Sequence, residues 1–196
     1  PCLDSADPDA KVHEQAGVWA ADPGAGPLPV AEVTWQGARA FCEAAGRRLC
    51  TEAEWQKAAR GGCELYADCV TDSRVHPWGP AAATCDFAVM DDDGGPGCGT
   101  GGPLAPGSRK AGASLYRALD MAGNMWEWVE DCYQGSHAGS PTDGSARTVC
   151  GDEFAGMKVS CGGGYLSTDN VRVSSRSPVT AAAGAHDASF RCCRSL

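Results

Sequence analysis

The sequence predicts one loop-rich α+β domain held together by disulfide bonds. A chain of 196 residues is long enough for one hydrophobic core and short for two. Its 26 Gly and 12 Pro are spread along the chain, which is typical of turns and loops rather than long regular elements. Its 12 Cys are an even number without a CxxC pair, so a disulfide framework formed in an oxidising compartment is expected.

The charge and hydropathy of the chain argue against two classes of partner. The net charge is −9, and nucleic acid is not expected, because each phosphate contact needs a Lys or Arg to replace a counterion. No apolar run approaches about 20 residues, so no transmembrane segment is expected.

The chain begins at Pro1 without an initiator Met or a signal segment, which indicates a removed leader or a fragment. With the cysteines, this favours a secreted, periplasmic or cell-surface protein.

The first elements of the domain follow an arm. Residues 1–30 are expected to be irregular, because Pro, Gly, Ala and Asp dominate them without periodicity, and the domain is expected to occupy 31–196. A β-prone run, Val33 to Trp35, opens the domain, and apolar residues then recur at helical spacing from Ala38 to Ala45. Gly46 is expected to end this helix.

A second helix is predicted to begin at Thr51, where Glu54 stands three residues later and completes a capping box. Gly61 and Gly62 are expected to end it. From Cys63 to Gly112 turn-forming residues dominate. Such a long loop needs cysteines or a metal ion to hold it in place.

The last part of the chain carries the remaining strands. The apolar segment Leu119 to Val129 leads into a strand that reaches Cys132, Val171 and Val173 alternate like a half-exposed strand, and Phe190 to Cys193 read as a closing strand. The domain has few Leu, Ile or Phe, so large aromatic rings are expected in its core. The tryptophans expected there are Trp35, Trp55, Trp78, Trp126 and Trp128.

Six motifs occur in a characteristic order between residues 33 and 193. They are Val33-Thr34-Trp35 with Ala38 and Ala40, Gly46-Arg47-Arg48-Leu49 with Thr51-Glu52-Ala53-Glu54-Trp55, Pro77-Trp78-Gly79, Gly123-Asn124-Met125-Trp126-Glu127-Trp128, Gly162-Gly163-Gly164-Tyr165, and Phe190-Arg191-Cys192. In this order and approximate spacing the chain resembles the formylglycine-generating enzyme, or sulfatase-modifying factor, family. The resemblance implies an irregular α+β fold of the C-type-lectin-like kind, and it indicates that the family's opening N-terminal segment is missing.

The resemblance also implies which chemistry to look for. Family enzymes oxidise a substrate cysteine with copper(I) held by two cysteines just after the glycine motif, and soft thiolates are the ligands that copper(I) selects. The first of these positions aligns with Ser167, and residues 168–171 contain no Cys. Neither Cys161 nor the neighbouring Cys192 and Cys193 offers the same spacing. Copper is therefore not expected, and the oxidase chemistry is expected to be lost.

The cysteines are expected to act as cross-links. The resemblance implies a bond between Cys42 and Cys192. Cys50 stands where the family usually has Pro, and Cys193 is an extra neighbour of Cys192, so these two are expected to pair. Two further bonds would close small loops, Cys63 with Cys69 and Cys85 with Cys98. The pairing of the remaining four cysteines stays open, namely Cys2, Cys132, Cys150 and Cys161.

The resemblance further implies calcium. In the family one calcium ion is held at positions that correspond here to the side chains of Asp120 and Glu127 and the carbonyls of Gly123 and Met125. These are hard oxygen ligands of the kind calcium prefers; the alternative is that the two carboxylates only cap a turn. A second, weaker candidate site would use Asp86 and the carbonyl of Phe87, with Asp91 to Asp93 as a further source of oxygen.

A polar segment follows the glycine motif at the place of the former active site. It consists of Ser167, Thr168, Asp169, Asn170 and Arg172, and it is either a recognition surface or an ordinary loop. With the chemistry deleted and the fold retained, we expect a non-catalytic module that binds a protein, peptide or glycan outside the cytoplasm. The alternatives are an oxidase with displaced cysteine ligands and a structural subunit of an extracellular assembly.

Overall fold

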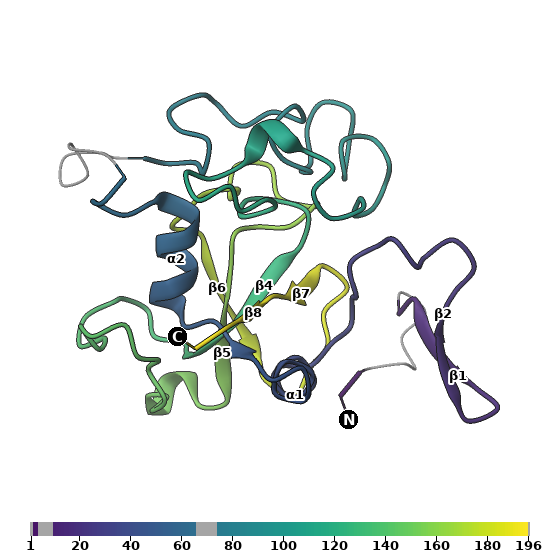
Figure 1. Cartoon of the computed structure of the whole chain (residues 1–196), viewed down its shortest axis with the longest axis horizontal. Helices are drawn as coiled ribbons and strands as arrows, with labels where there is room; N and C mark the ends of the chain where they lie inside the picture. The colour runs from purple at the N-terminus through teal and green to yellow at the C-terminus, as the bar shows by residue number, and fades with distance from the viewer. Residues whose placement is uncertain (1, 4–9, 66–73, 196) are drawn as a thin grey trace.

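The structure, a computed structural model, describes residues 2–3, 10–65 and 74–195. Its centre is a four-stranded sheet in the order β6 (Arg176–Thr180), β5 (Met157–Cys161), β4 (Trp126–Cys132) and β7 (Ala188–Phe190). Strand β5 is antiparallel to both β4 and β6, whereas β4 and β7 are parallel. Figure 1 shows long loops gathered at one end of this sheet and two helices beside it. The predicted loop-rich α+β fold is confirmed.

Helix α1 (Trp35–Ala44) begins one turn earlier than the apolar pattern indicates. The hydroxyl of Thr34 accepts a hydrogen bond from the Gly37 amide at 3.0 Å, which satisfies one of the free N–H groups at the helix start. Trp35 therefore belongs to the helix, and its indole nitrogen donates to the Val129 carbonyl at 2.8 Å. Gly46 follows the C-cap with a φ of 67°, as expected for a left-handed helix end.

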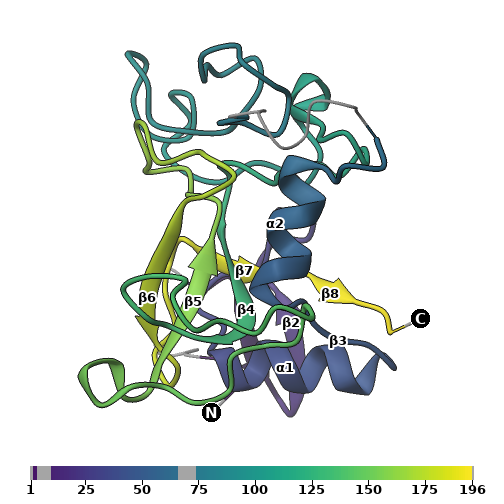
Figure 2. The same ribbon diagram turned by 90° about the vertical axis from the view of Figure 1, so that its left-hand side faces the viewer.

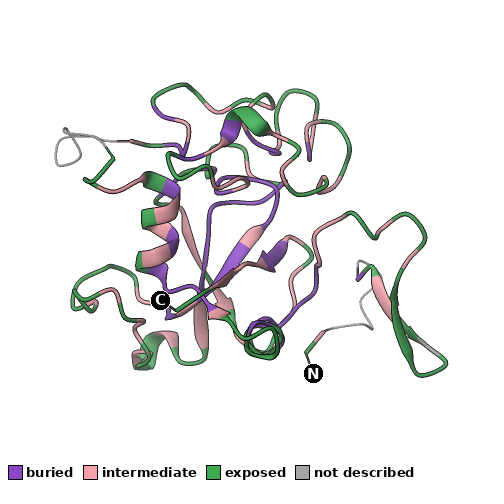
Figure 3. Cartoon of the chain, viewed as in Figure 1, coloured by how far each residue is buried: buried purple, intermediate pink, exposed green. Residues whose placement is uncertain are grey.

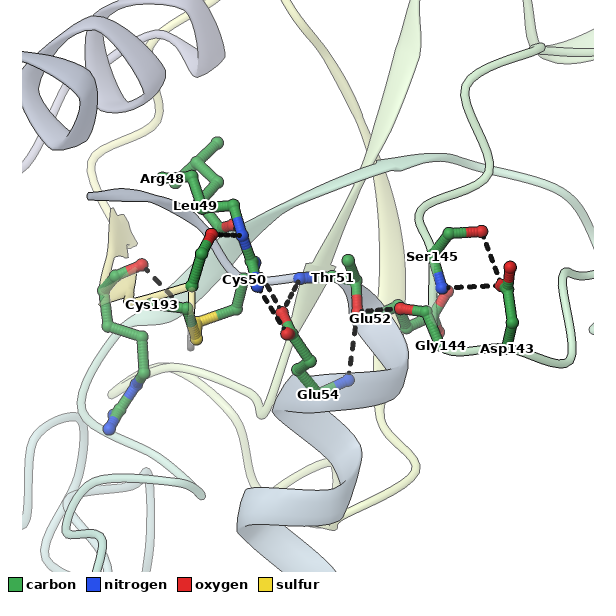
Figure 4. Close-up of polar contacts among 12 residues, drawn as sticks. Arg48, Leu49, Cys50, Thr51, Glu52, Glu54, Asp143, Gly144, Ser145 and Cys193 are labelled. Atoms are coloured by element: carbon green, nitrogen blue, oxygen red, sulfur yellow. Dashed lines mark hydrogen bonds and ion pairs between the residues drawn. A yellow bond between two sulfur atoms is a disulfide. The ribbon is translucent and has the colours of Figure 1, made fainter. Parts of the chain in front are cut away.

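Helix α2 (Glu52–Arg60) has the predicted capping box. Thr51 and Glu54 exchange hydrogen bonds, with Glu54 N donating to the Thr51 hydroxyl at 3.1 Å and Thr51 N donating to the Glu54 carboxylate at 2.9 Å. Arg48 of the short strand β3 (Arg48–Leu49) reaches the same carboxylate at 2.6 and 2.7 Å. Figure 4 shows these contacts beside the bond between Cys50 and Cys193. One carboxylate thus ties the helix start to β3.

The expectation of an irregular arm over 1–30 is wrong in its middle. Strands β1 (Val12–Gln15) and β2 (Val18–Ala21) form an antiparallel hairpin, which lies to one side of the main sheet in Figure 1. Its two turn residues, Ala16 and Gly17, have φ values of 53° and 81°. This two-residue turn usually carries Asn or Asp before Gly, and Ala16 gives no such signal.

Two expectations about the last strands are also wrong. Val171 and Val173 lie in no strand, and both are buried rather than half-exposed. Val171 accepts from His76 Nδ1 at 2.9 Å, and Val173 N donates to the Val75 carbonyl at 2.9 Å, so this segment pairs with a loop instead of a sheet. The closing strand is interrupted at Arg191, after which β8 (Cys192–Cys193) pairs with β3.

The core lies between the helices and the sheet. One cluster joins Trp55 of α2 to Met121, Val129, Val159 and Cys161, and a second joins α1 to β4 and β7 around Trp128. Figure 3 shows buried residues concentrated along β4 and its neighbours, whereas the outer loops and two 3₁₀ turns, η1 (Lys110–Gly112) and η2 (Asp152–Phe154), are mostly exposed. Figure 2 shows α1 and α2 against the sheet from a second side.

Disulfide bonds connect distant parts of the chain. Cys42 in α1 is bonded to Cys192, and Cys50 is bonded to Cys193, the pairs named from the sequence. The bond between Cys85 and Cys98 closes a loop as expected, and Cys132 is bonded to Cys150, a pair that the sequence left open. The expected pairing of Cys63 involves Cys69, which lies outside the described residues.

Neither of the α-helices in the described ranges combines the length and the apolar character required to cross a membrane.

Candidate functional site

Ser167 closes the turn that follows the glycine motif. Its hydroxyl accepts a hydrogen bond from Gly164 N at 3.1 Å, its amide donates to the Gly164 carbonyl at 2.9 Å, and its carbonyl accepts from Asp91 N at 2.9 Å. Gly163 has a φ of 80°, and a Cβ there would lie 2.5 Å from the Asn170 carbonyl oxygen. The position that the resemblance assigns to a copper ligand is thus occupied by a hydroxyl that holds a tight turn.

Two of the described cysteines, Cys2 and Cys161, form no disulfide. Cys161 ends β5 inside the core beside Trp55, and burial raises the pKa of its thiol well above the ordinary value of 9.0, with Glu52 and Glu127 adding to the effect. The thiolate is the form that binds metals and attacks substrates. Cys2 is exposed and lies beside the start of α1, where its carbonyl accepts from Thr34 N at 3.2 Å. The two thiols therefore occupy different parts of the molecule.

A polar groove of about 450 Å³ lies beside this turn. Three of the five residues expected in a recognition surface line it, namely Asp169, Asn170 and Arg172, whereas Ser167 and Thr168 do not. The remaining lining comes from Trp126, Ser174, Ser175, Arg176 and Ser177.

The groove takes its shape from alternating side chains. Val171 and Val173 are buried, so the residues between and around them face outward. Arg172 Nε donates to the Asp169 carbonyl at 2.9 Å, which fixes its direction, and Arg176 is held by Glu52 at 2.7 Å. A buried apolar pair thus presents polar groups along one edge of the sheet.

Trp126 forms the aromatic part of this groove. It was expected in the core, but it is only half-buried, as is Trp78, whereas Trp35, Trp55 and Trp128 are buried. Its indole N–H makes no hydrogen bond to any residue in the described part of the chain. The groove therefore combines an open aromatic face, a free donor, an amide, a guanidinium and hydroxyl groups.

The residues expected to hold calcium lie in the turn before β4 and in β4 itself. Asp120 Oδ2 accepts a hydrogen bond from Gly107 N at 2.5 Å. Asn124 Oδ1 accepts from Leu104 N at 2.9 Å, and Asn124 Nδ2 donates to the Leu104 carbonyl at 3.0 Å. Asp120, Gly123 and Asn124 have φ values of 56°, 77° and 65°, which is a strongly constrained turn. Burial raises the pKa of Asp120, and the nearby charge of Glu127 raises it further, although the hydrogen bond from Gly107 opposes this.

The carboxylate of Glu127, in β4, already accepts hydrogen bonds from two neighbouring side chains. Its Oε2 accepts from Trp55 Nε1 at 2.7 Å and from Arg191 Nε at 2.5 Å, and its Oε1 accepts from the Arg191 guanidinium at 2.5 Å. Arg191 also donates to the Leu119 carbonyl at 3.0 Å. Its pKa is raised, because attraction to Glu127 outweighs the lowering effect of burial.

Three oxygen atoms of this turn are available to bind calcium. The carbonyls of Gly123 and Met125 and the Oδ1 of Asp120 accept no hydrogen bond from the residues that the structure describes. Three hard oxygens in a constrained turn suit calcium. Glu127 would have to share its carboxylate between the metal and Arg191.

The second candidate calcium site has weaker support. Asp86 is exposed, and the Phe87 carbonyl packs against Gly112, where a Cβ would lie 1.9 Å from its oxygen. Asp92 Oδ1 accepts from Gly94 N at 2.9 Å and so supports its own turn. Within 2–3, 10–65 and 74–195, no three His, Cys, Asp or Glu side chains are grouped as a metal site. This site stays a prediction.

Sequence reasoning missed a larger cavity next to the candidate calcium turn. It measures about 640 Å³ and lies where the end of α1, the loop around 106–120 and the segment joining β7 to β8 meet. Arg47, Lys110, Arg117 and Arg191 contribute its cations. Arg47 and Arg191 are far in the sequence from Lys110 and Arg117, and no motif links the four, so only the fold brings them together.

Comparisons with known proteins give the same family as the motifs. A family model described as the sulfatase-modifying factor enzyme 1-like domain matches residues 8–196. A formylglycine-generating enzyme of Thermomonospora curvata is 30% identical over 217 aligned positions, which cover 98% of this chain and 67% of that protein. An inactive C-alpha-formylglycine-generating enzyme 2 of Mus musculus is 36% identical over 116 positions, which cover 55% of this chain and 33% of that protein. The chain thus spans only part of each relative.

Solved structures agree on the fold. The structure of PvdO from Pseudomonas aeruginosa superimposes with a TM-score of 0.68 at 20% identity, and the match covers 94% of this chain and 70% of that one. At this identity the likeness establishes the shared architecture.

Proposed function

The chain belongs to the sulfatase-modifying factor, or formylglycine-generating enzyme, family, and on that premise we propose that it is a non-catalytic recognition module. The observation that carries this proposal is at Ser167. A hydroxyl stands where the family places its first copper-binding cysteine, and it is used to close a turn with Gly164. A hydroxyl is a poor ligand for copper(I), which selects thiolates. The scaffold is retained and its metal ligands are replaced.

The proposed ligand is a glycan, bound in the polar groove. The half-buried ring of Trp126 offers an apolar face and an N–H without a hydrogen-bond partner among the described residues, and Asn170, Arg172 and three serines line the same groove. Sugars present both an apolar ring face and many hydroxyl groups, and a site for them needs an aromatic side chain together with donors and acceptors. Protein and peptide ligands offer fewer hydroxyl groups for this dense polar lining.

We also propose that calcium stabilises the turn before β4. The support is the set of three oxygens from Asp120, Gly123 and Met125 that lack hydrogen-bond partners among the described residues. When bound, calcium would supply charge to a site where burial disfavours the ionised form of Asp120. Its role here is structural.

The protein is proposed to work outside the cytoplasm, as a secreted, periplasmic or cell-surface module. Two adjacent bonds from Cys192 and Cys193, together with those closing the loops at Cys98 and Cys150, support this proposal. Disulfides persist in oxidising compartments and are rare where thiols are kept reduced.

A second candidate function is an oxidase with displaced cysteine ligands. Cys161 favours it, because this thiol is free and directly precedes the glycine motif. The buried, protonated state of the thiol and the position of Cys2 beside α1 weigh against it.

One experiment separates these candidates. Free thiols are counted by intact mass after alkylation, first under native and then under denaturing, non-reducing conditions. The recognition proposal expects Cys161 to react only after denaturation, and it expects no turnover of a cysteine peptide with copper(I). Cys2→Ser serves as the matched control, because it removes the exposed thiol alone. Turnover that survives Cys2→Ser and disappears in Cys161→Ala would establish the oxidase instead.

The ligand class is tested by binding to an oligosaccharide array. Asn170→Ala and Arg172→Ala are each expected to weaken the strongest glycan signals about fivefold or more, since each removes hydrogen bonds to a polar ligand. Arg194→Ala is the control, because Arg194 is exposed and does not line the groove. An array without any signal above that of a reduced, unfolded sample would overturn the glycan assignment.

A further inference from the structure

The 640 Å³ cavity is lined in part by the candidate calcium residues Asp120, Met125 and Glu127, and it shares no lining residue with the polar groove. Its volume is in the range of small-ligand sites, about 300 to 1,000 Å³. It is therefore a separate site, and its existence does not depend on the glycan proposal.

The cavity carries positive charge on a strongly negative protein. Arg47, Lys110 and Arg117 line it, and none of them forms an ion pair with a residue in the described ranges. The fourth cation, Arg191, is neutralised by Glu127. Against these three cations stands the Asp120 carboxylate, which forms no ion pair within 4 Å in the part of the chain that the structure describes. In a chain with a net charge of −9, such a surplus points to an anionic ligand.

Apolar side chains line the cavity together with these cations. Phe41 and Phe190 meet edge to face with their ring centroids 5.4 Å apart, and both line the cavity together with Val30 and Leu119. Phe41 is 62% exposed although it belongs to a helix with a buried face. A large exposed aromatic side chain at a concave, charged surface is typical of a binding site.

Arg117 adds a conformational observation. It has a φ of 64°, the left-handed region that a residue with a long side chain rarely adopts. This backbone conformation is strained, and such strain concentrates at binding and catalytic sites. The turn that adopts it places a cation at the cavity.

We propose that this cavity binds an acidic peptide segment in which a carboxylate side chain is followed by an apolar one. The carboxylates face Arg47, Lys110 and Arg117, and the apolar side chain packs on Phe41 and Phe190. Calcium bound at Asp120 would add to the positive charge and would not compete for it. The module thus has a peptide site in addition to its polar groove.

The test uses the disulfide-intact protein and a blocked pentapeptide of alternating Glu and Leu. Binding is measured by isothermal titration calorimetry in 50 mM and in 300 mM salt, with EDTA and with calcium. Replacing every Glu of the peptide by Gln is expected to weaken binding at least tenfold, because several ion pairs are lost together. Replacing Leu by Ser is expected to weaken it severalfold, and higher salt is expected to reduce the affinity of the Glu peptide.

Protein variants locate the site. Lys110→Gln and Arg117→Gln are each expected to weaken binding about two- to fivefold, with unchanged thermal stability because both side chains are exposed. Arg194→Gln controls for net charge, and Arg172→Gln, in the groove, is expected to leave peptide binding unchanged. Absence of binding, equal binding of the Gln peptide, or equal effects of the controls would each overturn the peptide site. None of these results bears on the oligosaccharide array, so the two proposals fail separately.

Discussion

The indole nitrogen of Trp55 donates a hydrogen bond of 2.7 Å to Glu127, 72 residues further along the chain. The same carboxylate binds Arg191, which follows β7. One buried carboxylate therefore joins α2, β4 and the C-terminal segment. The motifs that carry Trp55, Glu127 and Arg191 are widely separated in the sequence, and this contact gives a physical reason for their occurring together.

Glu127→Gln is expected to lower the free energy of unfolding by about 2 to 4 kcal/mol. The amide can still accept from Trp55, but the partly buried Arg191 loses the carboxylate with which it forms its ion pair. Unfolding by urea, in EDTA to exclude calcium effects, measures this loss. Glu43→Gln, which breaks an exposed pair with Arg39, is the control and should cost less than about 1 kcal/mol. Equal losses in both variants would contradict the assignment of Glu127.

Calcium is expected to raise the stability of the protein after EDTA treatment. At about 100 times its dissociation constant the gain would be about 2.7 kcal/mol. Asp120→Ala is expected to remove most of this gain, whereas Asp92→Ala, in an exposed turn, should retain it. Urea unfolding with and without calcium measures both. A wild-type curve that does not move with calcium would refute the calcium proposal.

Stability is expected to fall in acid through Glu54. The hydrogen bond from Arg48 lowers the pKa of Glu54 below its ordinary value of 4.5, so its ionised form stabilises the fold above that pH. As the pH falls below 4.5, Glu54 becomes protonated in the unfolded state first. Its contribution to stability is then lost as the pH falls through the lower pKa that Glu54 has in the folded state. Glu54→Gln keeps an acceptor for Thr51 N but loses the charge.

The expected loss in Glu54→Gln is therefore at most about 1 kcal/mol at pH 7, because the carboxylate is partly exposed. The difference between wild type and variant should shrink steadily as the pH falls below 4.5. Unfolding measured at intervals from pH 3 to pH 7 tests this. A difference that stays constant over that range would show that Arg48 does not interact with the charge.

Gly112→Ala is expected to destabilise the protein by about 1 to 3 kcal/mol, where the loop that carries Gly112 packs against the loop that carries Phe87. A Cβ at this position would lie 1.9 Å from the Phe87 carbonyl oxygen, so the backbone of one loop has to shift. Gly102→Ala is the matched control, since no atom lies within 4 Å of its Cβ position. Thermal unfolding compares the two, and equal midpoints would argue against the close packing of these loops.

Removing the bond between Cys132 and Cys150 by a double Ala substitution is expected to cost about 3 kcal/mol. The two residues are 18 apart, and the estimate follows from the lost constraint on the unfolded chain. Urea unfolding of the double variant measures it. A loss below about 1 kcal/mol would show that the loop is already ordered in the unfolded reference state.

Local signals in the sequence predicted the helices well. Thr51 and Glu54 form their capping box, and Gly46 ends α1, because these features depend on residues within one turn. Val171 and Val173 show the opposite case. Their alternation fits a strand, but the partners that fix them, Val75 and His76, lie in a distant loop, and a buried loop and an edge strand have the same pattern.

The candidate site was predicted only in part for the same reason. Asp169, Asn170 and Arg172 are close in sequence and line one groove. Trp126 lines the same groove only because the fold brings the start of β4 next to them. The cavity with Arg47, Lys110 and Arg117 had no local signal at all. This charge surplus combines Arg47, which follows α1, with Lys110 and Arg117 of the loop around 106–120, so it becomes visible only once the fold is known.

The two neighbouring cysteines at the C-terminus also determine how the protein responds to proteases. Cys192 and Cys193 are bonded to Cys42 and Cys50, so any single cut between residues 51 and 191 leaves two pieces that stay covalently joined. A nick between these residues would break the backbone, but the disulfides would hold the two pieces together, and under non-reducing conditions the mass would rise only by one water molecule. A module of this construction can be cleaved once and remain in one piece.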